Sequence, residues 1–341
     1  MGKQSFLANI SQYLLARGVM GFAHSFSENR NLEIGARLGS IVHDINGGRR
    51  KRAIENVRWC LPDVDEARAA EIVEQSYQHM IQLFLVDSIA APKLITADAW
   101  PGYVEMGNVQ PVIDLLLRNR PAIMITGHCG NWELLGSLLG VLGYPIWGLA
   151  RPLDNPLLND WLVKQREARG MHVLSKFGSM QIIQSVVRTG GYVAFVADQN
   201  AGDRGLFTPF FGRLASSYKS IALLAMRYRV PIVAGMAMRL GNYFKYRLHL
   251  ADIIEPDDWL HQPDPIFYIT ARYNRAIESM VRMAPEQYLW VHRRWKSRPR
   301  HEREGKPFPK RLRAKLEALP WMTDEEMQRI LEGEGESALR R

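Results

Sequence analysis

The sequence predicts an α/β protein with three layers (α/β/α), in which a largely parallel sheet is preceded by N-terminal helices. From about residue 100 onward, short apolar runs suited to buried strands alternate with segments of helical periodicity. This alternation is typical of a parallel sheet with helices on both faces. Residues 31–95 carry only helical patterns. Hydrophobic residues make up 47% of the 341 residues and charged residues 23%, a composition that supports a sizeable core and excludes a disordered chain.

The chain divides into four regions: an amphipathic helix at 1–30, a helical accessory segment at 31–100, the α/β domain at 101–300, and a basic, charged tail with a short helix at 301–341. The apolar residues of the first region recur at near-helical intervals. They are Phe6, Leu7, Ile10, Leu14, Leu15, Met20 and Phe22. Because Arg17 and His24 interrupt the run, we do not expect it to span a bilayer. It is either a helix lying in the plane of a membrane surface or a helix packed on its own domain.

In the accessory segment, Leu61-Pro62-Asp63 breaks one helix, and a second begins near Asp65. The second carries an apolar stripe that we interpret as core: Ile72, Tyr77, Met80, Ile81, Phe84 and Leu85. The strands expected beyond it are 122–126, 192–197, 231–238 and 246–250, and the helices are 112–117, 134–142, 220–227 and 272–283. Near the end, Thr323 followed by Glu326 predicts a capping box.

The formal net charge of +9 is regional. Residues 291–315 contain eleven Lys or Arg and two Glu, which accounts for the whole excess. This segment could attract anionic lipid headgroups or an acidic protein, or it could be a solvated face to which His292 belongs. No nucleic-acid-binding module accompanies it, so we expect no nucleic acid partner. Two distant cysteines, Cys60 and Cys129, predict neither a disulfide framework nor a cysteine-based zinc site.

The segment most informative about chemistry is residues 123–136, IMITGHCGNWELLG. A buried strand ends there, a glycine-flanked loop carries His128, and a helix begins near Asn131, which is a good N-cap. Ligands of open α/β sheets bind beyond the carboxyl ends of strands, where this histidine is expected. If the chain folds back, Glu133 can reach the imidazole and make His128 a general base. The alternative is an ordinary loop histidine, with Glu133 favoured by the helix dipole.

An H-x4-D/E pattern after a strand resembles the signature of the glycerolipid acyltransferase superfamily, and HCGNWE resembles its branch of bacterial lipid A late acyltransferases. Four further segments are similar to that family and occur in the same order: ENVRWCLP at 55–62, ARP with NPL at 150–157, ADQ with FFG at 197–212, and APEQYLWVHRRWK with RP at 284–299. The chain departs from the family pattern at Leu61, where phenylalanine is usual. It also lacks a strongly apolar first helix and a threonine-rich stretch after FFG.

The resemblance implies acyl transfer from an acyl carrier protein thioester to a hydroxyl of a lipid A precursor, on the cytoplasmic face of the bacterial inner membrane. His128 would then be the base and Glu133 would orient it. The thioester is the activated donor, so no cofactor or metal is expected. Asn131 is a further substrate-binding candidate, and Arg204 is another if it faces the site.

Two other substrate-binding candidates follow expected strand ends. Arg151 suits a phosphate or the phosphopantetheine of the carrier, or else forms a structural salt bridge. Asp198 would position the acceptor or Arg151, or else stabilise a turn. Two alternatives to the lipid A reaction stay open. One is the same chemistry on a lysophospholipid or a mannosyl glycolipid, and the other is a non-catalytic membrane-binding scaffold.

Overall fold

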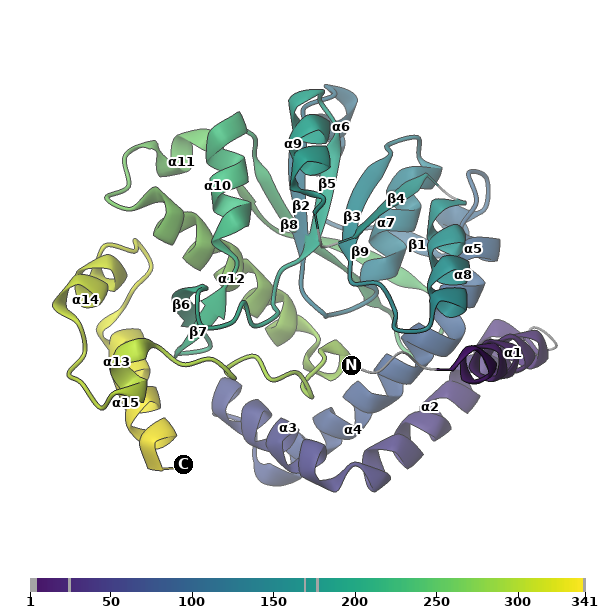
Figure 1. Cartoon of the computed structure of the whole chain (residues 1–341), viewed down its shortest axis with the longest axis horizontal. Coiled ribbons are helices and arrows are strands. Elements are labelled where there is room, and N and C mark those ends of the chain that lie inside the picture. Colours follow the sequence, from purple (N-terminus) through teal and green to yellow (C-terminus); the bar gives the residue numbers. More distant parts are fainter. Residues whose placement is uncertain (1–4, 24–25, 169, 176–177, 340–341) are drawn as a thin grey trace.

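The computed structural model describes residues 5–23, 26–168, 170–175 and 178–339. At its centre lies a seven-stranded sheet with the strand order β1-β9-β8-β2-β5-β3-β4 (Figure 1). These strands are β1 (Val104–Met106), β2 (Ala122–Thr126), β3 (Ile146–Ala150), β4 (Met171–Ser175), β5 (Tyr192–Val196), β8 (Ile232–Arg239) and β9 (Tyr246–Ile254). All neighbouring pairs are parallel except β8 and β9. The predicted fold class, with its largely parallel sheet, is confirmed.

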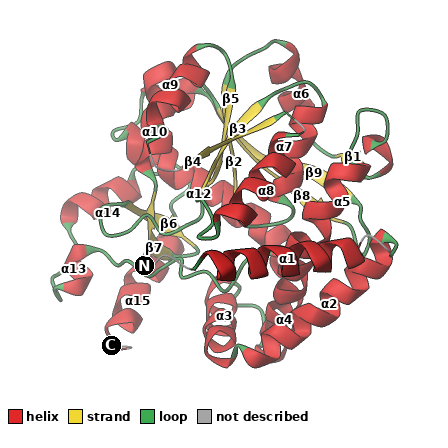
Figure 2. Ribbon diagram, turned by 45° about the vertical axis from the view of Figure 1, so that its right-hand side comes forward, coloured by secondary structure: helices red, strands yellow, loops and turns green. Residues whose placement is uncertain are grey.

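Helices cover both faces of this sheet (Figure 2). One face packs against α6 (Gln110–Leu117) and α7 (Trp132–Val141), and the other against α9 (Met180–Arg188), α10 (Lys219–Tyr228) and α12 (Pro265–Met283). Alternate side chains of strand β2 pack on opposite faces of the sheet. Ile123 and Ile125 belong to the hydrophobic core on one face, and Ala122 and Met124 belong to the core on the other. Burial on both faces explains why β2 reads as a continuous apolar run.

The N-terminal region is helical, as expected. It comprises α1 (Phe6–Ala23), α2 (Glu28–Ile45), α3 (Gly47–Cys60), α4 (Glu66–Gln82), the π-helix η1 (Leu83–Asp87) and α5 (Ser88–Leu94). Asp65 caps α4 by accepting a hydrogen bond from the Arg68 N–H at 2.8 Å. Ile72 and Tyr77 are buried, as predicted for the stripe, but Phe84 is 48% exposed. The π-turn breaks the helical register there, so the interpretation of Phe84 as core was wrong.

The remaining elements are η2 (Trp100–Gly102), α8 (Pro156–Glu167), the antiparallel hairpin β6 (Leu206–Phe210) and β7 (Arg213–Ser217), α11 (Pro256–Leu260), η3 (Pro285–Gln287), α13 (Arg300–Arg303), α14 (Lys310–Glu317) and α15 (Asp324–Leu339). The C-terminal region thus has three helices rather than one short one. Its apolar side chains Leu316, Leu319 and Ile330 are buried in the main core. The Thr323 hydroxyl accepts from the Glu326 N–H at 3.1 Å, the backbone half of the expected box. Among the described residues, no helix is long and apolar enough to cross a membrane.

Candidate active site

Two neighbouring parallel strands bring His128 and Asp198 together. In the register of β2 and β5, Thr126 lies opposite Val196. His128 and Asp198 each follow two residues after these strand ends. The Nδ1 atom of His128 lies 2.6 Å from Oδ1 of Asp198, and the backbone N–H of His128 donates to Oδ2 at 3.0 Å. The Asp198 side chain is fully buried, whereas that of His128 is 12% exposed. One carboxylate therefore holds both the ring and the main chain of His128.

The charge of Asp198 determines which ring nitrogen of His128 can accept a proton. Burial alone would raise the pKa of Asp198, but the adjacent His128 lowers it well below its ordinary value. An ionised carboxylate only accepts hydrogen bonds, so Nδ1 of His128 carries the proton. In the neutral ring, Nε2 then presents its lone pair toward the exposed side. This is the arrangement that a general base requires.

The loop that carries His128 is fixed by the segments around it. The Leu289 N–H donates to the carbonyl of His128 at 3.0 Å, and the Gly130 N–H donates to that of Gln287 at 3.1 Å. Gly130 has a φ of +58°, which a glycine adopts without strain. Its carbonyl lies 3.1 Å from Nε2 of His79 on α4. Burial lowers the pKa of His79 to about 3, so this ring is neutral and donates through Nε2.

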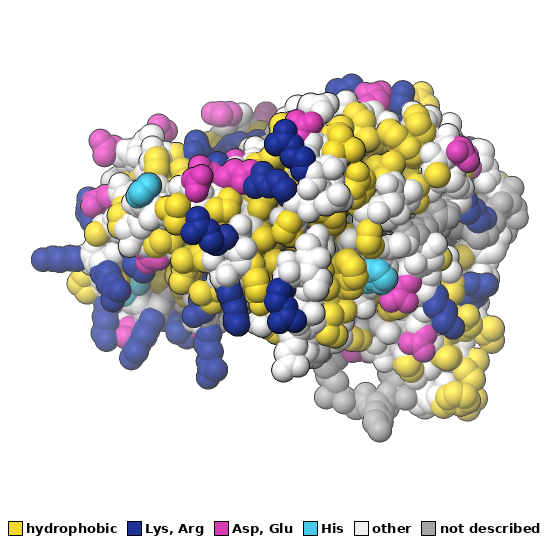
Figure 3. Space-filling model, turned by 90° about the horizontal axis from the view of Figure 1, so that it is seen from above, with side chains coloured by type: hydrophobic (Ala, Val, Ile, Leu, Met, Phe, Trp, Pro, Cys, Tyr) yellow, Lys and Arg dark blue, Asp and Glu magenta, His cyan; other side chains and the backbone are white. Residues whose placement is uncertain are grey.

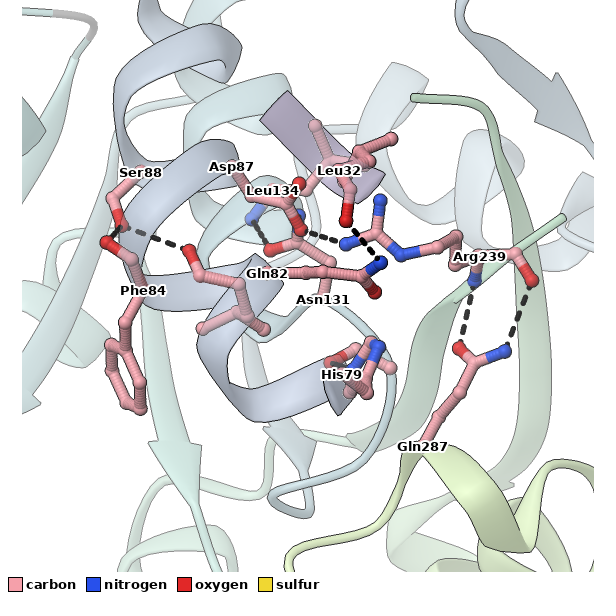
Figure 4. Close-up of polar contacts among 12 residues, drawn as sticks. Leu32, His79, Gln82, Phe84, Asp87, Ser88, Asn131, Leu134, Arg239 and Gln287 are labelled. Carbon is pink, nitrogen blue, oxygen red and sulfur yellow. Dashed lines mark hydrogen bonds and ion pairs between the residues drawn. The ribbon is translucent and has the colours of Figure 1, made fainter. Parts of the chain in front are cut away.

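A buried polar network anchors the start of α7 (Figure 4). Asn131 caps the helix by accepting from the Leu134 N–H at 2.9 Å, and its amide donates to Asp87 at 3.0 Å. Asp87 also forms an ion pair with Arg239, and both side chains are almost wholly buried. Gln287 makes two hydrogen bonds to the backbone of Arg239, at 2.9 and 3.0 Å. Asn131 is fully buried, so it supports the loop from behind rather than facing a substrate.

Glu133 does not contact His128 as expected. It lies in the first turn of α7 and pairs with Arg166 of α8, whose Nε donates to it at 2.8 Å. Among the described residues, no hydrogen bond or ion pair joins Glu133 to His128. The expected pairing is corrected because α7 begins at Trp132, which directs Glu133 toward α8, while Asp198 already occupies Nδ1 of His128.

Three side chains surround the exposed part of the His128 ring. Nε2 of Gln199 lies 3.3 Å from Nε2 of His128. The rings of His292 and Trp132 meet it edge-on, with centroids 4.8 and 5.0 Å away. Burial and the proximity of His128 lower the pKa of His292, so its ring is uncharged near neutral pH. The interpretation of His292 as part of a solvated basic face is therefore corrected.

Two predicted binding residues lie apart from this pair. Arg151 is 60% exposed, and its nearest carboxylate is that of Asp154 at 3.9 Å. Arg204 is exposed in the loop before β6. Neither contacts His128 or Asp198 in the part of the chain that the structure describes. They face solvent, where a ligand could still reach them.

The neighbouring cysteine is not a nucleophile. Cys129 is completely buried, and this burial raises the pKa of its thiol to about 12. No group of three or more His, Cys, Asp or Glu among the described residues could hold a metal ion.

Sequence reasoning missed the roles of Gln199, Arg166, His292 and His79. A signal existed for the central pair, because His128 and Asp198 each follow an expected parallel strand by a similar distance. Arg166 and His79 gave no such signal, since their contacts depend on how α8 and α4 pack against the domain.

Comparisons with known proteins identify the family of the chain. The family described as bacterial lipid A biosynthesis acyltransferase matches residues 5–297. The chain is 24% identical over 278 residues to the lipid A biosynthesis palmitoleoyltransferase of Escherichia coli (strain K12), covering 78% of this chain and 85% of that protein. It is 25% identical over 283 residues to the lauroyltransferase of the same organism (80% and 86%) and 26% identical over 275 residues to the myristoyltransferase (77% and 80%). The chain therefore belongs to the bacterial lipid A biosynthesis acyltransferase family.

Proposed function

We propose that this protein transfers a fatty acyl chain from an acyl carrier protein thioester to a hydroxyl of a lipid A precursor. Family membership supports acyl transfer onto a lipid A-type acceptor, since the relatives named above are lipid A lauroyl-, myristoyl- and palmitoleoyltransferases. The observation that carries the proposal is the His128–Asp198 pair, with Nε2 of His128 directed to the accessible side.

In this reaction Nε2 of His128 takes the proton of the acceptor hydroxyl as its oxygen attacks the thioester carbonyl. Asp198 holds the ring in the required tautomer and stabilises the imidazolium that forms. The same proton then passes to the departing thiolate. A thioester is already activated, so the mechanism calls for neither a metal nor a covalent intermediate on the enzyme. Glu133 takes no part in this step, because its carboxylate is paired with Arg166.

We place the protein peripherally at the cytoplasmic face of the inner membrane, with α1 on an anionic lipid surface. Helix α1 exposes a set of large apolar side chains: Phe6, Leu7, Leu14, Leu15 and Val19. It is held on the domain through Asn155, whose amide donates to the Asn9 carbonyl at 3.0 Å. Exposed apolar side chains on a helix that is held to the domain suit insertion between lipid headgroups.

The carrier protein would approach the basic C-terminal side. Lys and Arg side chains gather at the left of Figure 3, which is the side of α13, α14 and α15 in Figure 1. Exposed basic residues there include Arg293, Lys296, Lys310 and Arg311. Such a surface accelerates the association of an acidic partner.

The test is a transfer assay with labelled acyl carrier protein thioester and a panel of acceptors, run with the wild-type protein and His128→Ala. We expect product on the lipid A precursor with the wild type and none with the variant. Product only on a lysophospholipid or a mannosyl glycolipid would keep the mechanism and reject the acceptor. No turnover with any pair would favour the non-catalytic scaffold.

A further inference from the structure

We infer that Gln199 is a further catalytic residue, the side-chain donor to the oxyanion that forms on the thioester carbonyl. This inference rests on the proposed role of His128 as the base. Gln199 directly follows Asp198 beyond the carboxyl end of β5, and its side chain is exposed. Its amide nitrogen is within 3.3 Å of Nε2 of His128, the atom that must receive the proton.

The direction of the hydrogen bond between Gln199 and His128 follows from the proton on Nδ1, at the other side of the ring. Because Nδ1 of His128 donates to Asp198, the neutral ring can only accept at Nε2. The Gln199 amide must therefore be the donor. It occupies the place from which an acceptor hydroxyl would donate its proton. When a hydroxyl displaces it, the displaced N–H remains beside the carbonyl that this hydroxyl attacks.

The backbone of Gln199 is fixed even though its side chain is exposed. Its carbonyl accepts from Arg294 at 3.5 Å, and Arg294 is itself buried. The next residue, Asn200, forms two hydrogen bonds with Ser297, at 3.2 and 3.4 Å. Within the described residues, the Gln199 side chain makes no hydrogen bond other than the one to His128. A fixed backbone with an available amide is a preorganised donor.

Several backbone N–H groups around the His128 loop already have acceptors within the fold. The N–H of His128 donates to Asp198, and the N–H groups of Gly130 and Asn131 donate to the carbonyls of Gln287 and Ala237. The Leu134 N–H is capped by Asn131. These four N–H groups are already used within the fold. The Gln199 side chain beside Nε2 of His128 supplies a donor that these four groups do not.

The proposed transfer proceeds through one tetrahedral species. Nε2 of His128 takes the hydroxyl proton, the hydroxyl oxygen bonds to the carbonyl carbon, and the carbonyl electron pair moves to its oxygen, which accepts from the Gln199 N–H. Collapse of this tetrahedral species restores the carbonyl and breaks the carbon–sulfur bond. The proton on Nε2 then passes to the sulfur. The products are an ester and a free thiol.

The experiment compares Gln199→Ala with Gln110→Ala, a matched substitution on α6 outside the site, using a lauroyl thioester of acyl carrier protein and a lipid A precursor. Loss of one oxyanion donor lowers kcat by roughly 10²–10³, so we expect that loss for Gln199→Ala with KM little changed. The slow hydrolysis of the thioester without acceptor should fall by the same factor, because it passes through the same oxyanion. Gln110→Ala should match the wild type, and all variants should unfold at the same temperature.

Two outcomes would overturn the inference. If Gln199→Ala turns over normally while His128→Ala is inactive, Gln199 is not catalytic and the proposed function stands. If transfer falls but hydrolysis does not, Gln199 positions the acceptor instead of the oxyanion. An active His128→Ala would instead reject the base itself, so failure of the proposed function is distinguishable.

Discussion

Asp198 is a single buried carboxylate with two tasks at the active-site histidine. One oxygen accepts from the ring and the other from the backbone of His128. It therefore fixes the tautomer of His128 and the position of its loop together. Glu133, which lies closer to His128 in the sequence, is engaged with Arg166.

The two cysteines predict how the enzyme responds to thiol reagents. Cys60 and Cys129 are fully buried, and burial raises the pKa of each thiol. We expect iodoacetamide to leave the native protein active and unmodified, because the reagent reacts with accessible thiolates. Mass spectrometry after treatment checks this, with urea-unfolded protein as the positive control. Rapid inactivation with labelling of Cys129 would contradict the non-covalent mechanism.

At the residue scale, the sequence identified His128 but assigned it the wrong partner. A spacing of five residues suggested Glu133, whereas the pairing with Asp198 spans seventy residues and depends on strand register. The order β2-β5 in the sheet is a tertiary property. Asn131 was predicted correctly as a cap, but its burial against Asp87 depends on how η1 docks.

At the scale of elements, the buried Asp87–Arg239 pair joins η1 to β8 behind the site. Asp87→Ala leaves the Arg239 charge buried without its partner, so we expect a loss of about 3–5 kcal/mol in the free energy of unfolding. Glu33→Ala is the control, because the Arg30–Glu33 pair is exposed and should contribute less than about 1 kcal/mol. Urea unfolding measures both. Equal losses in the free energy of unfolding for Asp87→Ala and Glu33→Ala would show that the buried pair stabilises the fold no more than an exposed one.

Glu278 on α12 predicts a pH dependence for the β6–β7 turn. It accepts from the Phe211 N–H at 2.8 Å, and burial raises its pKa to about 7. Between the unfolded pKa of about 4.3 and the folded value, the folded state binds more protons, so its stability falls as pH rises. We expect Glu278→Gln to remove this dependence of stability on pH. Its free energy of unfolding should exceed that of the wild type by on the order of 2 kcal/mol at about pH 8. A difference that does not vary with pH in urea titrations would contradict this assignment.

The elements that sequence patterns predicted best are those buried on two sides. Strands β2, β5 and β8 appeared as apolar runs because both of their faces are covered. Strand β4 at the edge of the sheet is only partly buried and showed no such run. The β6–β7 hairpin contains Pro209 and lies outside the main sheet, so neither alternation nor a long apolar run marked it.

At the scale of the whole molecule, residues far apart in the chain assemble the site. His79, His128, Asp198 and His292 come from the N-terminal helices, from two strand ends and from the segment before α13. The accessory helices thus contribute to the candidate active site. Sequence patterns predicted that these regions exist, but not that α4 contacts the loop of His128.

The exposed apolar face of α1 predicts how the molecule binds membranes. We expect the double substitution of Leu14 and Leu15 by serine to weaken binding to anionic vesicles, because it removes apolar area that would enter the headgroup region. Leu117→Ser is the matched control, since Leu117 is equally exposed but lies on α6. Vesicle cosedimentation at increasing salt measures the effect. If the wild type, the double variant and Leu117→Ser bind vesicles equally, the membrane contact does not involve Leu14 and Leu15.

The most direct test of the account compares Asp198→Asn with Glu133→Gln in the transfer assay. An amide at position 198 can donate to Nδ1 and so leave the wrong tautomer, a change that lowers kcat by about 10⁴ in a related His–Asp arrangement. We predict a loss approaching that size for Asp198→Asn and a much smaller one for Glu133→Gln, with the fold unchanged by circular dichroism. A larger loss for Glu133→Gln than for Asp198→Asn would contradict the central claim that Asp198 orients the base.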